Sequence, residues 1–318
     1  MTEKQSDQSK YIYGPVPSRR LGRSLGVDVI PPKICTLDCV YCQIGRTPTK
    51  STTRRDFGHV DAILSELAEK LASGVTADYI TIGGSGEPTL HSRLGELIDR
   101  IRSLTTIPVA LLTNGTLFDR PDVRAEAAKA DVVIPSLDAG DEAVFQAVNR
   151  PAPDISIENV VSGLSRFRAE FAGQIWLEVF LIEGMNTGAE EIAQLRELIG
   201  RIRPDKIQLN SAVRPAAEAG IEPISEDRLE AIALQIGGHC EVIGAAPAIE
   251  PTRHQQRACA DVLSMLKRRP CSVSDICAGL GIIPNEAIKY LTQLQAEGVV
   301  TSERQGSVTY YFSPAEPA

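Results

Sequence analysis

Residues 35–42 read CTLDCVYC, and this stretch holds three of the seven cysteines in a chain of 318 residues. The spacing is C-x3-C-x2-C, and no fourth cysteine lies near it along the sequence. Cys35, Cys39 and Cys42 therefore crowd three thiols into one short segment. In a reducing compartment, clustered cysteines more often bind metal than form disulfides.

Three kinds of site could use this stretch. A structural zinc site normally closes with four ligands, often as two C-x2-C pairs, and no second pair follows here. A redox C-x2-C pair would leave Cys35 without a role. Three thiolates suit a [4Fe–4S] cluster in which one iron lacks a cysteine. Such an iron would be open to a substrate, like the open position of a catalytic zinc.

The composition is that of a soluble globular protein, with 43% apolar and 23% charged residues. No run of 18 apolar residues occurs, and the start MTEKQSDQSKYIYGP lacks an apolar signal core. We therefore expect a cytoplasmic protein without a membrane span.

Charge is distributed unevenly along the chain. The net charge is −8, yet residues 1–60 carry ten Lys or Arg and five Asp or Glu, a local +5. Its basic residues include Arg19, Arg20, Arg23, Lys33, Arg46, Lys50, Arg54 and Arg55. This segment flanks the cysteines, and it is either a solvated loop or a positive rim that guides an anionic substrate.

After an irregular start rich in Pro, Gly and Ser, short apolar runs alternate with helical patterns. The predicted strands are 26–30, 78–83, 107–112, 131–136, 175–182 and 205–210. The predicted helices between them are 58–73, 91–103, 121–129, 155–171 and 188–202. The alternation predicts an α/β fold with a parallel sheet. Six strands are too few for a full barrel, so we expect a partial (βα)6 TIM-like barrel or open sheet, with reactive groups beyond the C-terminal strand ends.

The pattern changes near residue 250 to consecutive helices. Three helices and a hairpin are predicted at 257–268, 272–282, 284–298 and 299–312. Three helices and a β wing predict a small winged helix-turn-helix domain. We therefore expect a barrel domain, 1–250, and a winged helix domain, 251–318.

CTLDCVYC resembles the signature of the radical SAM superfamily, with an aromatic residue, Tyr41, before the last cysteine. The resemblance extends through most of residues 10–215. It implies that Cys35, Cys39 and Cys42 ligate three irons of a [4Fe–4S] cluster, and that S-adenosylmethionine chelates the fourth. The reduced cluster would cleave S-adenosylmethionine to methionine and a 5′-deoxyadenosyl radical, which removes a hydrogen atom from the substrate.

The same resemblance assigns cofactor contacts to residues that follow the predicted strands. GGSGEPTL (83–90) is similar to the superfamily's GGE-type segment, whose backbone holds the methionyl amino group, although Ser85 is inserted. TNG (113–115) and SLDAG (136–140) follow the next two strands. The expected cofactor-binding residues are Tyr41, Gly83, Gly84, Gly86, Glu87, Thr113, Asn114, Asp138 and Arg214.

Each of these positions also has a structural interpretation. The glycine-rich segment could be a plain β-to-α turn, the polar side chains could cap helices, and Arg214 could form a surface ion pair. Glu178 lies inside a predicted strand, where an unpaired carboxylate is costly, so it faces either a polar lumen or solvent. Further lumen or rim candidates are Ser136, Gln208 and Asn210.

The prefix YGPVPSRRLGRSLGVD (13–28) resembles bacterial radical SAM proteins that are grouped with wyosine-type tRNA base enzymes. This implies an RNA base as the first substrate hypothesis, and a reducing partner such as flavodoxin or ferredoxin. A radical activase or peptide-modifying enzyme is the alternative. From another class, an iron–sulfur redox sensor could regulate transcription through the winged domain. The glycine-rich segment favours catalysis, because a sensor needs no cofactor cradle.

The C-terminal domain lacks the positive charge typical of nucleic-acid binding. Residues 257–318 contain six Lys or Arg and six Asp or Glu. A protein-contact or substrate-presenting role is therefore favoured over DNA binding. Cys271 and Cys277 are predicted to be small buried side chains and not ligands.

Overall fold

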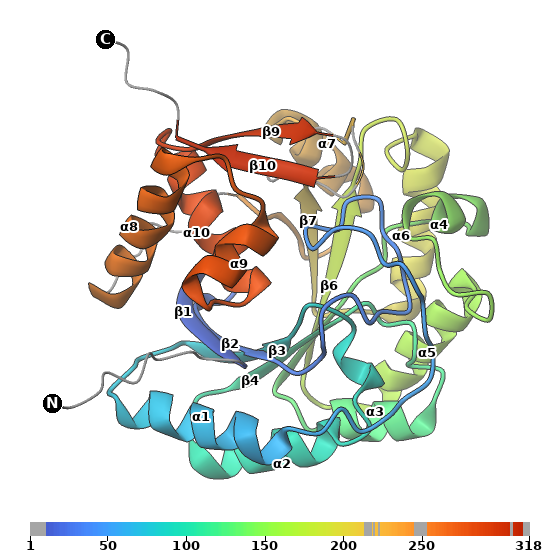
Figure 1. Ribbon diagram of the computed structural model, residues 1–318. Helices are drawn as coiled ribbons and strands as arrows, with labels where there is room; N and C mark the ends of the chain where they lie inside the picture. Colours follow the sequence, from blue (N-terminus) through green and yellow to red (C-terminus); the bar gives the residue numbers. More distant parts are fainter. Residues whose placement is uncertain are drawn as a thin grey trace, which may run out of the picture.

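The computed structural model of the chain describes residues 11–212, 218, 220, 221, 223–244, 253–305 and 308–313. Its larger part is one sheet whose eight strands follow one another in chain order (Figure 1). The strands are β1 Ile12–Ser18, β2 Gly22–Asp28, β3 Tyr79–Gly83, β4 Val109–Thr113, β5 Val132–Pro135, β6 Gln174–Leu181, β7 Lys206–Ser211 and β8 Cys240–Val242. β1 is antiparallel to β2, and all other neighbours are parallel.

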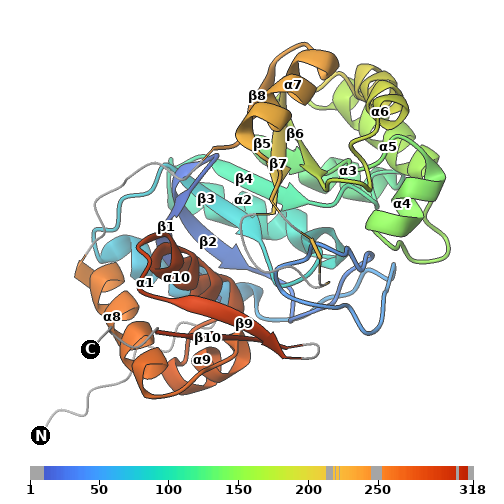
Figure 2. The ribbon, with the colours of Figure 1, turned by 90° about the horizontal axis from the view of Figure 1, so that it is seen from above.

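Helices cover the outer face of this sheet, as both views show (Figures 1 and 2). They are α1 Val60–Ala72, α2 Leu94–Leu104, α3 Pro121–Ala127, α4 Glu142–Val148, α5 Ile157–Glu170, α6 Ala189–Ile202 and α7 Glu226–Ile236, with a short 3₁₀ helix at Pro88–Leu90. Alternate strand residues such as Ile80, Ile82 and Leu209 are buried in the core beneath the helices. Because successive strand residues point to opposite faces, their neighbours, Thr81 among them, face the lumen of a partial barrel.

The expected α/β partial barrel is confirmed, since each of the six predicted strands overlaps one of β2 to β7. The count of six strands was too low, because β1 and β8 extend the sheet at its two edges. β1 was predicted to be irregular, but an edge strand tolerates residues such as Pro15 and Pro17. β8 and α4 are too short for a clear periodic pattern, whereas α7 has a helical pattern after Ser225 that the prediction left out.

A second unit follows the barrel in the described chain. Its elements are α8 Arg253–Arg268, α9 Val273–Leu280, α10 Pro284–Ala296, β9 Thr301–Gln305 and β10 Val308–Phe312. It has its own apolar core, and a capping box between Ser272 and Asp275 begins α9. Three helices and an antiparallel hairpin are the elements predicted here. Their assignment as a winged helix stays a prediction, as does the domain boundary at residue 250, which lies outside the described residues.

α10 packs beside the edge strand β1 (Figures 1 and 2). On β1, Tyr13 covers Gly26 so closely that a Cβ at Gly26 would lie 2.1 Å from the tyrosine ring. Burial raises the pKa of Tyr13, and the nearby carboxylates of Asp28 and Glu286 raise it further. Since Glu286 belongs to α10, the second unit reaches the lumen side of this hairpin. None of the described helices is long and apolar enough to cross a membrane.

Candidate functional site

The segment with Cys35, Cys39 and Cys42 follows β2, at the C-terminal end of the parallel strands. Each cysteine is half-buried, and each sulfur accepts a hydrogen bond from a side chain elsewhere in the chain. The pairs are Asn114 Nδ2 to Cys35 Sγ at 3.5 Å, Asn149 Nδ2 to Cys39 Sγ at 3.4 Å and Lys33 Nζ to Cys42 Sγ at 3.3 Å. N–H donors stabilise the thiolate, which is the form that binds metal.

The electrostatics around Cys35 and Cys39 suit a bound cation. Burial, with added contributions from the Glu87 carboxylate and the Cys42 thiol, raises the pKa of Cys35 to about 12. Burial also raises the pKa of Cys39, with added contributions from Asp138, Cys35 and Cys42. The three sulfurs therefore lie near one another, and the surroundings of Cys35 and Cys39 disfavour free thiolates. A coordinated metal supplies the missing positive charge and deprotonates such thiols.

The three cysteine side chains do not converge on the position of a single metal ion. Among the described residues, no three His, Cys, Asp or Glu side chains are placed to hold one common metal ion. A [4Fe–4S] cluster binds three cysteines through three different irons, so it does not need a single point of convergence. The donor set of three thiolates with N–H partners fits that cluster.

The glycine-rich segment after β3 lies directly against the cysteine segment. A Cβ at Gly86 would come within 2.1 Å of the Ile34 carbonyl oxygen, and one at Gly84 within 2.7 Å of Asp28 Oδ1. A Cβ at Gly83 would make only an ordinary contact, at 3.8 Å from Leu112. Gly84 and Gly86 are thus needed for close approach within the chain, whereas Gly83 is not.

Ser85, the inserted residue, also contributes to the contact between the glycine-rich segment and the residues after β2. Its backbone N–H and its hydroxyl donate to the two oxygens of Asp28, at 3.0 and 2.7 Å, and its carbonyl accepts from Lys33 N at 2.7 Å. Burial raises the pKa of Asp28, while the bonds from Ser85 lower it. Asp28 was not predicted as a site residue, although its position at the end of β2 was a signal.

Glu87 is only 2% exposed and accepts four hydrogen bonds. The donors are the backbone and hydroxyl of Thr89, the hydroxyl of Thr113 and the backbone N–H of Asn114. Burial raises the pKa of Glu87, and these donors oppose that shift. Glu87 and Thr113 therefore tie the end of β3 to the end of β4, and they hold Asn114 where its amide reaches Cys35.

Asp138, after β5, ties the cysteine segment to β6. One carboxylate oxygen accepts from Phe180 N at 2.8 Å, and the other accepts from the Tyr41 hydroxyl and from Asn149 Nδ2 at 2.7 Å. The Tyr41 ring also stacks on Phe180 at 3.9 Å between centroids. Burial raises the pKa of Asp138 to about 6, although its three donors oppose the shift. The Asn186 side-chain amide donates to the Asp138 carbonyl at 2.7 Å.

Glu178 points into the lumen and not to solvent. Its carboxylate forms an ion pair with Arg20 at 2.8 Å and accepts from Asn210 Nδ2 at 2.8 Å. Burial would raise the pKa of Glu178, but Arg20 and the other partners lower it overall. Gln208 is also buried, and its amide donates to Glu241 at 2.7 Å. Arg214, the ninth predicted cofactor contact, lies outside the described residues.

The basic segment before and after the cysteines is mostly neutralised within the chain, so it is not an open positive rim. Arg23, Arg46 and Arg54 form ion pairs with acidic side chains. Lys50 donates to two backbone carbonyls, and the Arg55 guanidinium lies over the Phe57 ring at 4.7 Å.

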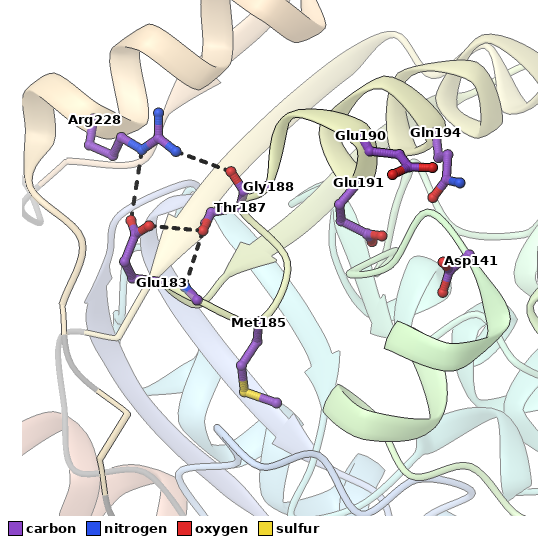
Figure 3. A pocket seen from close by; sticks show the side chains of 10 residues that line it. Asp141, Glu183, Met185, Thr187, Gly188, Glu190, Glu191, Gln194 and Arg228 are labelled. Atoms are coloured by element: carbon purple, nitrogen blue, oxygen red, sulfur yellow. Dashed lines mark hydrogen bonds and ion pairs between the residues drawn. The ribbon is translucent and has the colours of Figure 1, made fainter.

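A separate pocket of about 450 Å³ lies beside the segment that follows β6 (Figure 3). Figure 3 shows Arg228 next to Glu183, which also accepts from the Thr187 hydroxyl at 3.0 Å. Glu190 and Glu191 line the same pocket. None of the predicted site residues lines it, so it is distinct from the cysteine site.

Sequence reasoning missed Asn149 and Lys33, which donate to two of the sulfurs. Lys33 was noted only for its charge. Asn149 follows α4, more than a hundred residues after Cys39, and nothing in its local sequence marks it. A buried hydrogen bond of this kind depends on which segments the fold brings together.

The model of the radical SAM superfamily matches residues 29–199 of the chain, a segment that includes all three clustered cysteines. This chain belongs to the radical SAM superfamily. Structures of this superfamily share the fold: a radical SAM methyltransferase from Sphaerobacter thermophilus has a TM-score of 0.50 at 18% identity, over 69% of this chain and 66% of that one.

Two curated relatives of this radical SAM chain differ in length. A UPF0026 protein of Helicobacter pylori (strain J99) is 32% identical over 304 residues, which cover 94% of this chain and 96% of the relative. A protein of Brachyspira hyodysenteriae named GTPase Obg is 34% identical over 307 residues, which cover 96% of this chain. The radical SAM chain spans only 45% of the length of that relative.

Proposed function

We propose that the chain reductively cleaves S-adenosylmethionine at a [4Fe–4S] cluster and uses the resulting radical to abstract hydrogen from a substrate in the barrel lumen. The observation that carries the proposal is the set of three cysteine sulfurs, each with its own N–H donor, at the C-terminal end of the parallel strands. Such a cluster, when bound, supplies the electron that breaks the carbon–sulfur bond of S-adenosylmethionine.

The protein's own residues hold and orient the two cofactors. Cys35, Cys39 and Cys42 would ligate the cluster, and Asn114 and Asn149 would orient two of these ligands by donating to their sulfurs. The backbone of the segment that begins at Gly83 would bind the methionyl group.

Glu87, Thr113 and Asp138 are assigned a positioning role. Their side-chain oxygens are engaged within the chain, as donors and acceptors between strand ends. Tyr41 likewise is fixed by Asp138 and Phe180, so its ring forms a wall beside the cysteines. Fixed walls matter, because a primary alkyl radical attacks many C–H bonds and only position selects among them.

The test is anaerobic reconstitution with iron and sulfide, followed by addition of dithionite and S-adenosylmethionine. We expect 5′-deoxyadenosine and methionine from the wild type and neither from Cys39→Ala. If reconstituted wild-type protein retains the cluster but forms no 5′-deoxyadenosine, the proposed function is wrong.

The proposal also includes the substrate, the electron donor and the location that the sequence leads us to expect. They are an RNA base as substrate, electron supply by a flavodoxin or ferredoxin, and a cytoplasmic location. A peptide substrate or a radical-activase role is the enzymatic alternative. Specific DNA binding by the oxidised protein, together with no 5′-deoxyadenosine, would instead favour the redox-sensing regulator.

A further inference from the structure

Two consecutive arginines stand in the turn between β1 and β2. Arg20 makes the ion pair with Glu178, at 2.8 Å, without the geometry of a hydrogen bond. Arg19 Nη1 is buried and has no hydrogen-bond partner among the described residues. Of the basic residues around the cysteine segment discussed above, Arg19 is therefore the exception, because the others have partners within the chain.

Among the described residues, the charges in this part of the lumen do not balance. Arg19 and Arg20 contribute two positive charges, and Glu178 contributes one negative charge. Burial lowers the pKa of Arg19, the neighbouring Arg20 lowers it further, and only Glu178 acts in the opposite direction. A buried guanidinium stays charged, so an unpaired one is costly unless an anion joins it.

Arg19 and Arg20 lie at the start of β2, whereas the cysteine segment follows the end of that strand. Leu21, the next residue in the turn, belongs to the apolar floor of the lumen with Ile134 and Trp176. One layer above, Glu178 is near enough to raise the pKa of both Asp138 and Tyr41, which adjoin the cysteines. The arginines thus face the space between the floor and the cysteine segment.

The methionyl carboxylate of S-adenosylmethionine is not the best candidate for this anion. If it chelates iron, it must lie at the cysteine end of the barrel. The turn with Arg19 lies at the opposite end of β2, a strand of seven residues. At about 3.3 Å per residue, that strand is roughly 20 Å long. Because both arginines extend from that turn, an anionic group that meets both of them would lie nearer the floor of the lumen than the cysteines do. This position favours a group of the substrate over the methionyl carboxylate.

We propose that Arg19 and Arg20 form a binding site for an oxyanion of the substrate, a phosphate or carboxylate group, inside the lumen. The planar guanidinium fork binds such groups through two parallel hydrogen bonds. Buried Oε1 of Gln208 also lacks a partner among the described residues and would accept from a donor on the same substrate. This inference rests on the proposed function, because it treats the lumen as substrate space.

The experiment titrates the full-length, anaerobically reconstituted protein with inorganic phosphate and, separately, with acetate. Thermal unfolding without S-adenosylmethionine reports binding, and affinity for S-adenosylmethionine is measured independently by calorimetry. The variant is Arg19→Gln, and the matched control is Arg23→Gln, which removes an arginine of the same hairpin that is 45% exposed and paired with Asp78.

We expect saturable stabilisation of the wild type and of Arg23→Gln by at least one of the two anions. Arg19→Gln should weaken this anion binding about tenfold or more, the scale of a lost hydrogen bond to a charged group. Without anion, Arg19→Gln should be at least as stable as the wild type, because it removes an unpaired buried charge. A merely structural arginine would give the opposite result.

Three outcomes would overturn the inference. They are no saturable response of the wild type to either anion, equal anion binding by Arg19→Gln, and a selective loss of S-adenosylmethionine affinity in Arg19→Gln. The last outcome would assign the arginine to the carboxylate of S-adenosylmethionine. Should Arg19→Gln fail to fold, Arg19→Lys keeps the charge without the fork and should bind anion several-fold more weakly. Failure of 5′-deoxyadenosine formation would contradict only the proposed function, since anion binding is measured without it.

Discussion

The C-terminal unit contains three cysteines, Cys259, Cys271 and Cys277, as many as the 35–42 segment of the barrel, and burial alone does not distinguish these two sets. Burial raises the pKa of Cys35 to about 12 in the barrel, and it raises the pKa values of Cys259 and Cys277 to about 11 in the C-terminal unit. Residue type and burial are thus shared. The hydrogen bonds of the sulfurs differ.

In the C-terminal unit the three sulfurs lie in or against an apolar core, and two of them donate hydrogen bonds. Cys259 Sγ donates to Gln293 Oε1 at 3.5 Å, and Cys271 Sγ donates to the Arg269 carbonyl at 3.4 Å. Those bonds require protonated thiols. The sulfurs of Cys35, Cys39 and Cys42 instead accept from side-chain N–H groups, which favours thiolates. The direction of the hydrogen bond thus distinguishes the three cysteines that we propose as cluster ligands from Cys259 and Cys271.

The largest expected effect is the loss of iron when a clustered cysteine is replaced, and it tests directly whether the two sets of cysteines differ. Cys39→Ala should lose nearly all iron after anaerobic reconstitution, whereas Cys277→Ala should retain it. Iron and sulfide analysis with visible absorbance measures both variants. Equal loss in the two variants would mean that the ligands have been assigned to the wrong set.

A second pair of variants compares carboxylates whose pKa is lowered in each unit. Glu178→Gln leaves Arg20 without its partner in the lumen and should cost about 2–5 kcal/mol at neutral pH. Asp275→Asn removes the half-buried partner of Ser272 in the capping box of α9 and should have a smaller effect. Urea unfolding of both variants measures the two free energies. Equal destabilisation would contradict the burial of the Glu178 pair.

The pH dependence of Glu178 follows from the same pair. Arg20 keeps the pKa of Glu178 below the ordinary value of 4.5 in the folded protein. Its contribution to stability is therefore complete above that value and is lost as pH falls through the lower, folded pKa. The stability gap between the wild type and Glu178→Gln should shrink below about pH 4.5. A gap that stays constant into that range would show that the ion pair does not form.

A third pair of variants compares tight glycines. Gly86→Ala places a methyl group against the rigid Ile34 backbone and should cost about 1–3 kcal/mol or more, with impaired cluster retention. Gly279→Ala meets only the flexible end of Met265, at 2.8 Å from Cε, so the side chain can move. Urea unfolding and iron content should separate the two, and a tolerated Gly86→Ala would contradict the packing of the glycine-rich segment.

The smallest expected effect is on the cluster potential. N–H donors to sulfur stabilise the more negative, reduced cluster, so Asn149→Ala should lower its reduction potential. A net hydrogen bond of about 0.5–1.5 kcal/mol corresponds to about 20–60 mV for one electron. Redox titration followed by electron paramagnetic resonance measures it. Gln293→Ala, which removes the partner of Cys259, should leave the potential unchanged.

Much of the fold was predictable, because its signals are local. Apolar strand runs and helical periodicity predicted β2 to β7 and most of the helices, since each pattern reports which face of its own segment is buried. β1 was missed, because its two prolines look like loop residues and only its place at the sheet edge permits them. The three-residue β8 has too little sequence to show a period.

The sequence by itself determined the features that depend on neighbours along the chain. These are the cysteine spacing of residues 35–42 and the glycines that let residues 84–87 pack closely against the chain. Only the tertiary structure decided which groups surround those sulfurs. Asn149 reaches Cys39 and Arg20 reaches Glu178 across more than a hundred residues of chain. Such contacts follow from the order of the strands in the sheet, and a local sequence pattern does not specify that order.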